Sequence, residues 1–240
     1  MMNIPRELLL LSLAGQACAP ATNAPPPSAP ERASAPATMQ PLAQYTMNPG
    51  DEIALARSAA PASVSADAEV RVLGNRGYET AVQGKNGFVC VVERSWANHF
   101  DSEEFWNPRM RSPDCYNPPA ARTVLPTYLK RTEWVLAGLS KPELISRTKA
   151  ALLSKEFADP EPGSLSYMMS VQGHLNEADG HWHPHVMFFV PRATAAGANL
   201  PGSPLYAQEG DDTDPVTIVM VPVRKWSDGS PAPGLALTHQ

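Results

Sequence analysis

Histidines are the residues in this sequence whose types and spacing most suggest chemistry. Four of the six lie between positions 174 and 185, in the stretch GHLNEADGHWHPH. His181, His183 and His185 alternate with Trp182 and Pro184. In an extended chain, this alternation places the three imidazoles on one face.

Strand geometry limits how many of these imidazoles one metal ion could bind. At about 3.3 Å per residue, His181 and His183 are roughly 6.6 Å apart along the chain, and His181 and His185 about 13 Å apart. Because zinc requires nitrogen ligands at about 2.1 Å, only neighbours in the alternation chelate easily. A hairpin closing over LNEADG would bring His174 opposite this pair.

The hypothesis from this spacing is a mononuclear site for zinc, copper or nickel. His181 and His183 form its chelating pair and His174 its third ligand, with His185 or Asp179 as weaker candidates. In an enzyme, the metal would keep an open position for an activated water, with Glu177 as a base. A protein without metal, binding a partner through the aromatic segment from Trp96 to Trp106, is the third interpretation.

The N-terminus has the pattern of an export signal. Arg6 precedes a short apolar run, Leu8 to Ala14, and small residues lead to Cys18. The segment resembles the lipobox of bacterial lipoproteins, which implies a lipid on Cys18, although Gly15 stands where that motif usually has leucine. Cleavage by an ordinary signal peptidase is the alternative. We therefore expect a periplasmic or outer-membrane lipoprotein, or otherwise a secreted protein.

The domain organisation follows from composition. Residues 1–18 form the signal segment, and residues 19–50 form a tether rich in proline and alanine. Residues 51–240 form one globular domain with a frayed C-terminus. The net charge of −5 and the absence of basic clusters exclude a general nucleic-acid binder, so a small ligand or a protein partner remains.

Cys90 and Cys115 remain as a pair once Cys18 is assigned to the signal. In an oxidising compartment we expect them to form a structural disulfide. Closing a loop of about 25 residues is worth roughly 3 kcal/mol.

The fold expected is α+β, with strands and helices in the order β3-α2-β3. Three β-rich runs between residues 69 and 94 predict an antiparallel meander, with Asn86-Gly87 as a hairpin turn. Two amphipathic helices follow, the second opened by Ser140 and Glu143 as a capping box. Three further strands complete one antiparallel sheet with both helices packed on one face. A short helix capped by Asp51 precedes the first strand.

Overall fold

The computed structural model describes residues 35–176, 182–192, 195, 197–214 and 216–233. The chain divides into two units, residues 1–33 and residues 34–240, and all described elements belong to the second. Its helical elements are η1 (Leu42–Gln44), α1 (Pro49–Arg57), α2 (Ala62–Ser65), η2 (Ser95–Ala97), α3 (Pro118–Thr123), α4 (Leu125–Leu136) and α5 (Lys141–Leu153). None of the described helices is long and apolar enough to span a membrane.

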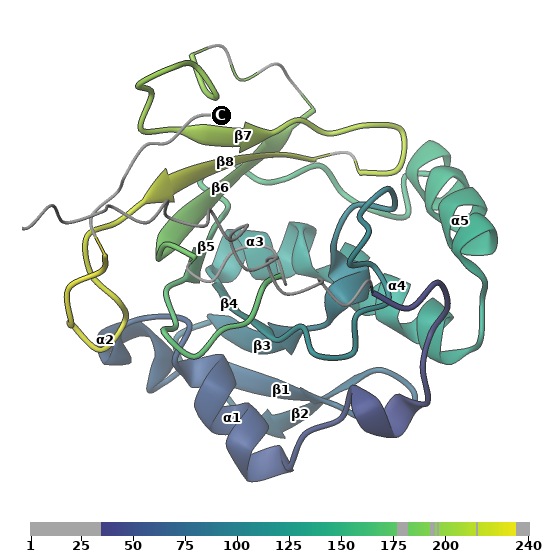
Figure 1. Ribbon diagram of the computed structural model, residues 1–240, viewed down its shortest axis with the longest axis horizontal. Helices are drawn as coiled ribbons and strands as arrows, with labels where there is room; N and C mark the ends of the chain where they lie inside the picture. Colours follow the sequence, from purple (N-terminus) through teal and green to yellow (C-terminus); the bar gives the residue numbers. More distant parts are fainter. Residues whose placement is uncertain (1–34, 177–181, 193–194, 196, 215, 234–240) are drawn as a thin grey trace, which may run out of the picture. The chain divides into compact units, whose positions relative to one another are not determined.

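One sheet of eight strands organises this unit (Figure 1). The strands are β1 (Glu69–Leu73), β2 (Tyr78–Val82), β3 (Val89–Glu93), β4 (Ser112–Tyr116), β5 (Leu165–Met168), β6 (His185–Pro191), β7 (Tyr206–Gln208) and β8 (Val216–Pro222). They are arranged in the order β2-β1-β3-β4-β5-β6-β8-β7. The predicted α+β class is therefore confirmed.

The purely antiparallel sheet predicted from the sequence is wrong, because β3 pairs with β1 in parallel. The β1–β2 hairpin forms as expected, and Gly74 and Gly77 close it with a 2.8 Å backbone hydrogen bond. Asn86-Gly87 does not make a second hairpin. Gly87, at φ +77°, lies instead in the connection that leaves β2, passes β1 and leads to β3 on the other side of β1.

The predicted β3-α2-β3 order is also wrong. A fourth strand, β4, precedes the two long helices, and four strands follow them. Pro113 within β4 and two prolines directly after Asn117 concealed this strand in the sequence. The residue 95–122 segment thus contributes a central strand of the sheet.

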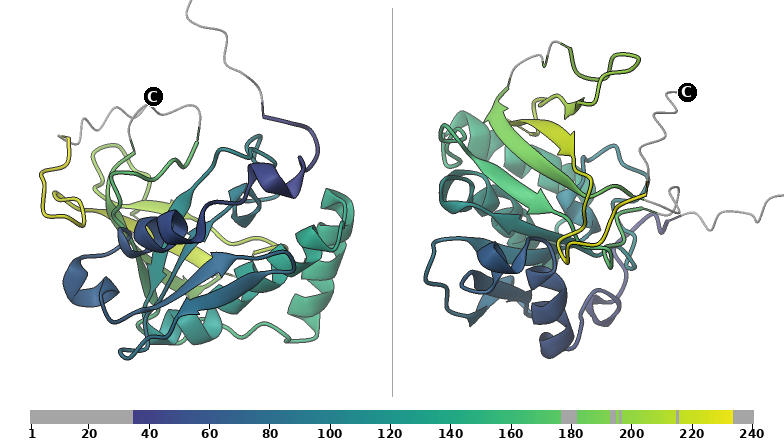
Figure 2. Two further views of the ribbon diagram at one scale, coloured as in Figure 1. Left: turned by 90° about the horizontal axis from the view of Figure 1, so that it is seen from below. Right: turned by 90° about the vertical axis from the view of Figure 1, so that its left-hand side faces the viewer.

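Helices cover both faces of the sheet, in contrast to the single covered face that we expected. In β3, Val89 and Val91 pack in a cluster with α3 and α4, whereas Cys90 and Val92 pack with α1. Because strand residues alternate between faces, α1 lies on the face opposite α3 and α4 (Figures 1 and 2). Asn48, and not Asp51, caps α1 by accepting a hydrogen bond from the Gly50 backbone at 2.9 Å.

The two long helices begin and end where the sequence indicates. The side chain of Glu143 accepts hydrogen bonds from the Ser140 backbone at 2.8 Å and from its hydroxyl at 2.6 Å. Gly138, at φ +88°, follows the last turn of α4, as expected for a helix C-terminus. The α5 helix packs on α4, in a cluster with Trp134, Leu144 and Ala151.

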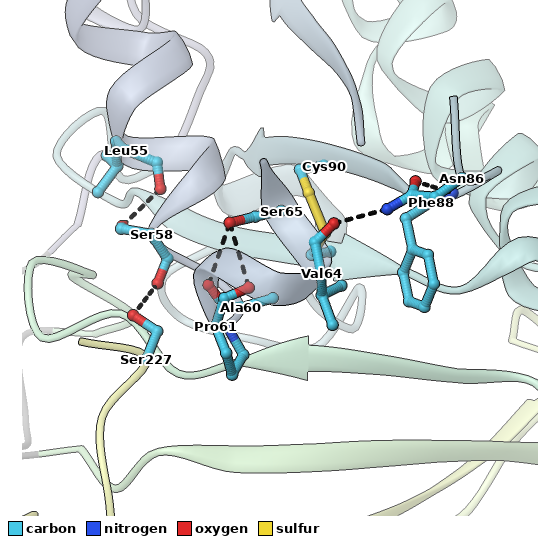
Figure 3. The surroundings of a disulfide bond; sticks show 11 residues. Leu55, Ser58, Ala60, Pro61, Val64, Ser65, Asn86, Phe88, Cys90 and Ser227 are labelled. Atoms are coloured by element: carbon cyan, nitrogen blue, oxygen red, sulfur yellow. Dashed lines mark hydrogen bonds between the residues drawn. A yellow bond between two sulfur atoms is a disulfide. The ribbon is translucent and has the colours of Figure 1, made fainter. Parts of the chain in front are cut away.

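The predicted disulfide between Cys90 and Cys115 is confirmed. The two cysteines face each other on β3 and β4, and their Cα atoms are 4.0 Å apart. Figure 3 shows Cys90 beside the chain between α1 and β1, where Ser65 donates hydrogen bonds to the Ala60 and Pro61 carbonyls. The disulfide therefore belongs to the α1 face, on the other side of the sheet from α3 and α4.

The aromatic segment proposed as a contact surface is buried. Trp96, Phe100, Phe105 and Trp106 are at most 7% exposed and pack together in one cluster. The side chain of Tyr45 joins them and donates a 2.8 Å hydrogen bond to the Trp106 carbonyl. These rings act as core, so they do not provide the surface for a partner protein.

Candidate functional site: an acid-lined cavity in the sheet

Two described histidines of the 174–185 stretch, His174 and His185, lie on the walls of two different cavities. His174 pairs through its backbone with Arg111 and lines a cavity of about 490 Å³ together with Trp182 and Trp226. His185 is the first residue of β6 and lines a cavity of about 170 Å³ on the α4 side of the sheet. His181, Asp179 and Glu177 lie outside the described residues, as does Cys18.

Among the residues that the structure describes, no three His, Cys, Asp or Glu side chains are arranged to hold a metal ion. His185 directs its Nδ1 towards the His183 carbonyl at 2.8 Å. Since a carbonyl only accepts, this nitrogen carries the proton, and Nε2 of the neutral ring is free to accept. Burial lowers the pKa of His185 and so favours that neutral form.

His183 presents a different situation. Its Nδ1 is buried and has no hydrogen-bonding partner within the described parts of the chain. The indole nitrogen of the adjacent Trp182 is also buried and has no hydrogen-bonding partner among the described residues. The Trp182 ring is edge-on to both His185 and Trp226, at centroid distances of 5.7 and 5.2 Å.

The smaller cavity contains the most unusual electrostatics of the described structure. Its lining includes Glu93 at the end of β3, Asp114 in the middle of β4, and Asp214 just before β8. Asp114 is 0% exposed and the other two are almost fully buried. Buried carboxyl groups are uncommon unless they are paired or bind a ligand.

The sheet register brings Glu93 and Asp114 together. Asp114 is opposite Val91 in the β3–β4 ladder, and Glu93 is opposite Ser112, so the two acids are diagonal neighbours on one face. Tyr116, two residues along the same face, donates a 2.6 Å hydrogen bond to Oε1 of Glu93.

Burial raises the pKa of Glu93 to about 7, although the hydrogen bond from Tyr116 and the charge of Arg131 act against this rise. Burial and the neighbouring Glu93 charge raise the pKa of Asp114 well above its ordinary value. Burial also raises the pKa of Asp214, partly offset by attraction to Arg131. At a pH near 7 Glu93 therefore still holds its proton in about half of the molecules, and the pKa values of the other two acids are displaced in the same direction.

Asp114 is the least satisfied of the three acids. The Ser166 and Tyr116 hydroxyls and the Cys115 backbone N–H lie near enough to oppose the rise in its pKa, but neither carboxylate oxygen accepts a well-formed hydrogen bond from the described residues. Ser166 Oγ is also buried without a partner there. By contrast, Asp214 accepts a hydrogen bond from the Val216 backbone at 3.3 Å.

The arginines near the cavity, Arg94 and Arg131, interact with groups other than the three acids. Arg94 forms a fully buried ion pair with Glu52 at 2.8 Å. Arg131, on α4, donates to the carbonyls of Trp96, Ala97 and Asn98 at 3.1–3.3 Å. Neither guanidinium forms an ion pair with an acid of the cavity in the described structure.

The remaining lining of the cavity is largely apolar and rich in sulfur. It includes side chains from the sheet and from the segment before β4, namely Met110, Met168, Met187, Met220, Phe189 and Ile218. Methionine side chains adapt their shape to what they contact. The cavity thus combines unpaired acceptors with a deformable apolar surface.

This site could not be identified from the sequence. Glu93 shares a strand face with Val89 and Val91, and that alternation was the one available signal. Asp114 lies between Pro113 and Cys115 in a segment without strand periodicity. No protein-family model, curated protein or solved structure matches the chain, so the site rests on its own geometry.

Proposed function

We propose that this chain is an exported, membrane-tethered binding protein whose small ligand occupies the acid-lined cavity. The observation that carries the proposal is the side chain of Asp114, which is fully buried, faces the cavity and has two unpartnered oxygens. Burying an unsatisfied polar group costs about 1–3 kcal/mol, and more for a charged one. A ligand that donates hydrogen bonds to Asp114 would offset this cost.

The cavity walls support binding of a ligand that has both a polar and an apolar part. Ligand sites typically combine an apolar lining with a few converging polar groups. The volume of about 170 Å³ has room for roughly six non-hydrogen atoms at ~30 Å³ each. The proposal is therefore a site for one small molecule, and the protein is a binding protein rather than a scaffold.

The sequence supports export and tethering. Cys18 and the Pro/Ala-rich segment after it are the features that favour a lipid anchor. The disulfide between Cys90 and Cys115 agrees with an oxidising compartment. Mass spectrometry of the mature N-terminus tests the anchor, since an unmodified Cys18 would remove the lipoprotein assignment.

Methionine methyl NMR detects binding at the cavity even when the natural ligand has not been identified. Met110, Met168, Met187 and Met220 line the cavity, whereas Met47 packs near α1 on the other face of the sheet and is the internal control. The mature chain with labelled methionine methyl groups is titrated with a library of small charged and neutral fragments.

At least one class of fragment is expected to shift the signals of the cavity methionines and leave that of Met47 unchanged. The Asp114→Asn variant, which has the same shape without the charge, should weaken this response at least tenfold. If no fragment of any class shifts the cavity methionines, the proposed function is refuted.

Transition-metal binding by the 174–185 stretch is a second candidate, favoured by the unpartnered Nδ1 of His183. Neutral imidazole is a common metal ligand. The mature chain, prepared without a histidine tag, is reconstituted with zinc, copper or nickel and its metal content measured. One equivalent that disappears when His181 and His183 are both replaced by alanine supports this function, and no bound metal in the unmodified chain excludes it.

A further inference from the structure

The charges around the cavity do not balance within the described structure. Three acids, Glu93, Asp114 and Asp214, line it. The Arg94 charge is matched by Glu52, which leaves Arg131 to act on Glu93 and Asp214, with His99 acting on Asp214 alone. When all three acids are ionised, the cavity has a surplus of negative charge.

The position of Arg131 leaves Asp114 uncompensated. The Arg131 guanidinium carbon lies 4.5 Å above the Phe100 ring, and its NH1 group is held by three backbone carbonyls. Its charge lowers the pKa values of Glu93 and Asp214, but it is not among the causes that act on Asp114. Asp114, the acid with two unpartnered oxygens, is therefore also the acid that Arg131 does not compensate.

The acceptors that remain match the donors of an ammonium group. Asp114 offers two oxygens, Glu93 has one oxygen beyond the one bonded to Tyr116, and neutral His185 has Nε2. An ammonium group has three N–H donors and no acceptor. An anion would meet the same groups with repulsion, and a neutral alcohol could satisfy only one or two of them.

Building on the proposed function, we infer that the ligand is a small primary alkylammonium ion. Its ammonium group is bound by Asp114 and Glu93, neither of which forms an ion pair with a described residue, and its alkyl chain lies against Met168, Met187 and Phe189. The Tyr116 and Tyr128 rings, which also line the cavity, add a favourable surface for a cation.

Proton release is the thermodynamic signature of such binding. In the empty cavity burial raises the pKa of Glu93 to about 7, so this acid is still partly protonated near neutral pH, and the pKa values of Asp114 and Asp214 are raised in the same direction. The other titratable or charged groups facing them are Arg94 after β3, Tyr116 on β4, Tyr128 and Arg131 on α4, and His185 on β6, together with His99 and Asp211, which act on Asp214. An entering cation stabilises the ionised carboxylates, so it displaces a proton and binds more tightly as the pH rises from about 6 to 8.

The experiment measures the binding of five probes to the mature chain by methionine methyl NMR and by calorimetry. They are n-butylamine, n-butanol, butyrate and, separately, zinc and calcium chlorides. Butylamine is cationic at pH 8, since amines of this kind resemble the lysine side chain, whose pKa is about 10.4. The variants are Asp114→Asn and Glu93→Gln, with Asp228→Asn, which replaces an exposed carboxylate, as the matched control.

Butylamine is expected to shift the cavity methionines and to bind at least tenfold more tightly than butanol or butyrate. Its affinity should fall at least tenfold in Asp114→Asn and remain unchanged in Asp228→Asn. Calorimetry in two buffers of different ionisation enthalpy should show that protons are released on binding.

Equal binding of butanol, or tighter binding of butyrate or a metal ion at the same methionines, overturns the ammonium inference and leaves the ligand site intact. A methionine response to none of these probes, while another fragment class does shift the cavity signals, also rejects the inference alone. Loss of binding in a variant counts only when its far-ultraviolet circular dichroism matches that of the unmodified chain.

Discussion

The Glu93→Gln substitution should remove a large part of the pH dependence of stability. Glu93 is 8% exposed and hydrogen-bonded to Tyr116, and burial raises its pKa from 4.5 to about 7. Glutamine has nearly the same shape and can still accept the Tyr116 hydrogen bond, but it does not ionise. The substitution therefore removes the charge without opening a cavity.

The sign of the effect follows from proton binding in the two states. Below about pH 4.5 the carboxyl is protonated in both the folded and the unfolded chain, so its full contribution to stability is present. Between 4.5 and about 7 the unfolded chain releases its proton while the folded chain retains it, which progressively favours unfolding. Above about 7 the loss is complete.

The magnitude follows from the two pKa values. They differ by about 2.5, and each pKa unit corresponds to about 1.4 kcal/mol, so the loss attributable to Glu93 is about 3 kcal/mol. Coupling to Asp114, whose pKa is raised in the same direction, adds to this loss and does not reverse it.

Urea unfolding at pH 4 and pH 8 measures this quantity. Between these conditions the free energy of unfolding of the unmodified chain should fall by about 3 kcal/mol more than that of Glu93→Gln. The control is Glu156→Gln, which replaces an exposed glutamate beyond α5 and should leave the pH profile unchanged. Parallel profiles for Glu93→Gln and the unmodified chain would refute the assignment of a buried, proton-retaining acid at this position.

Three further predictions concern groups around the same sheet. Replacing Tyr116 with phenylalanine removes the hydrogen bond that lowers the pKa of the buried β3 glutamate, so the midpoint of its pH–stability profile should move to higher pH; an unchanged midpoint contradicts this. Glu52→Ala leaves Arg94 buried and unpaired, so it should lower the free energy of unfolding by about 3–5 kcal/mol, measured with urea. The double replacement Glu52→Leu with Arg94→Met should lose much less stability, and an equal loss in both variants would contradict the buried ion pair. Replacing Cys90 and Cys115 with serine should cost about 3 kcal/mol, and reducing agent should destabilise the unmodified chain but not this variant.

The parts of the fold that local sequence determines were predictable. The capping box of Ser140 and Glu143 and the glycine after α4 fix helix ends through interactions within a few residues. The disulfide was predictable for a different reason, since only two cysteines remained once Cys18 was assigned to the signal. These features do not depend on which strands become neighbours.

The pairing of β3 was predicted wrongly from the sequence. Asn86-Gly87 favours a tight hairpin, yet β3 pairs with β1, which is separated from it by the whole of β2. In that position Val89 and Val91 contact α3 and α4 while Cys90 and Val92 contact α1, so β3 is buried on both faces. Burial on two faces outweighs the local preference of a two-residue turn, and a turn signal alone contains no information about it.

The candidate site illustrates the same limit. The histidines are close together in the chain, but His174 and His185 line two different cavities, because the segment carrying His174 pairs with Arg111 while His185 begins β6. The acids are far apart in the chain and meet only through the β3–β4 register and the approach of Asp214 before β8. Closeness in the sequence therefore predicted a histidine cluster larger than the one in the structure, and it gave no sign of the cluster of acids.

His185 is a candidate ligand both for a metal ion and for an ammonium group in the cavity. Its surroundings favour the ammonium group. Its Nδ1 is committed to the His183 carbonyl, so a metal would have to bind at Nε2. Its side chain lines the cavity of the buried acids, where burial favours the neutral ring and Nε2 can accept a hydrogen bond from a bound donor. A His185→Gln substitution should accordingly weaken butylamine binding without altering metal content, whereas the opposite result would return this histidine to a metal site.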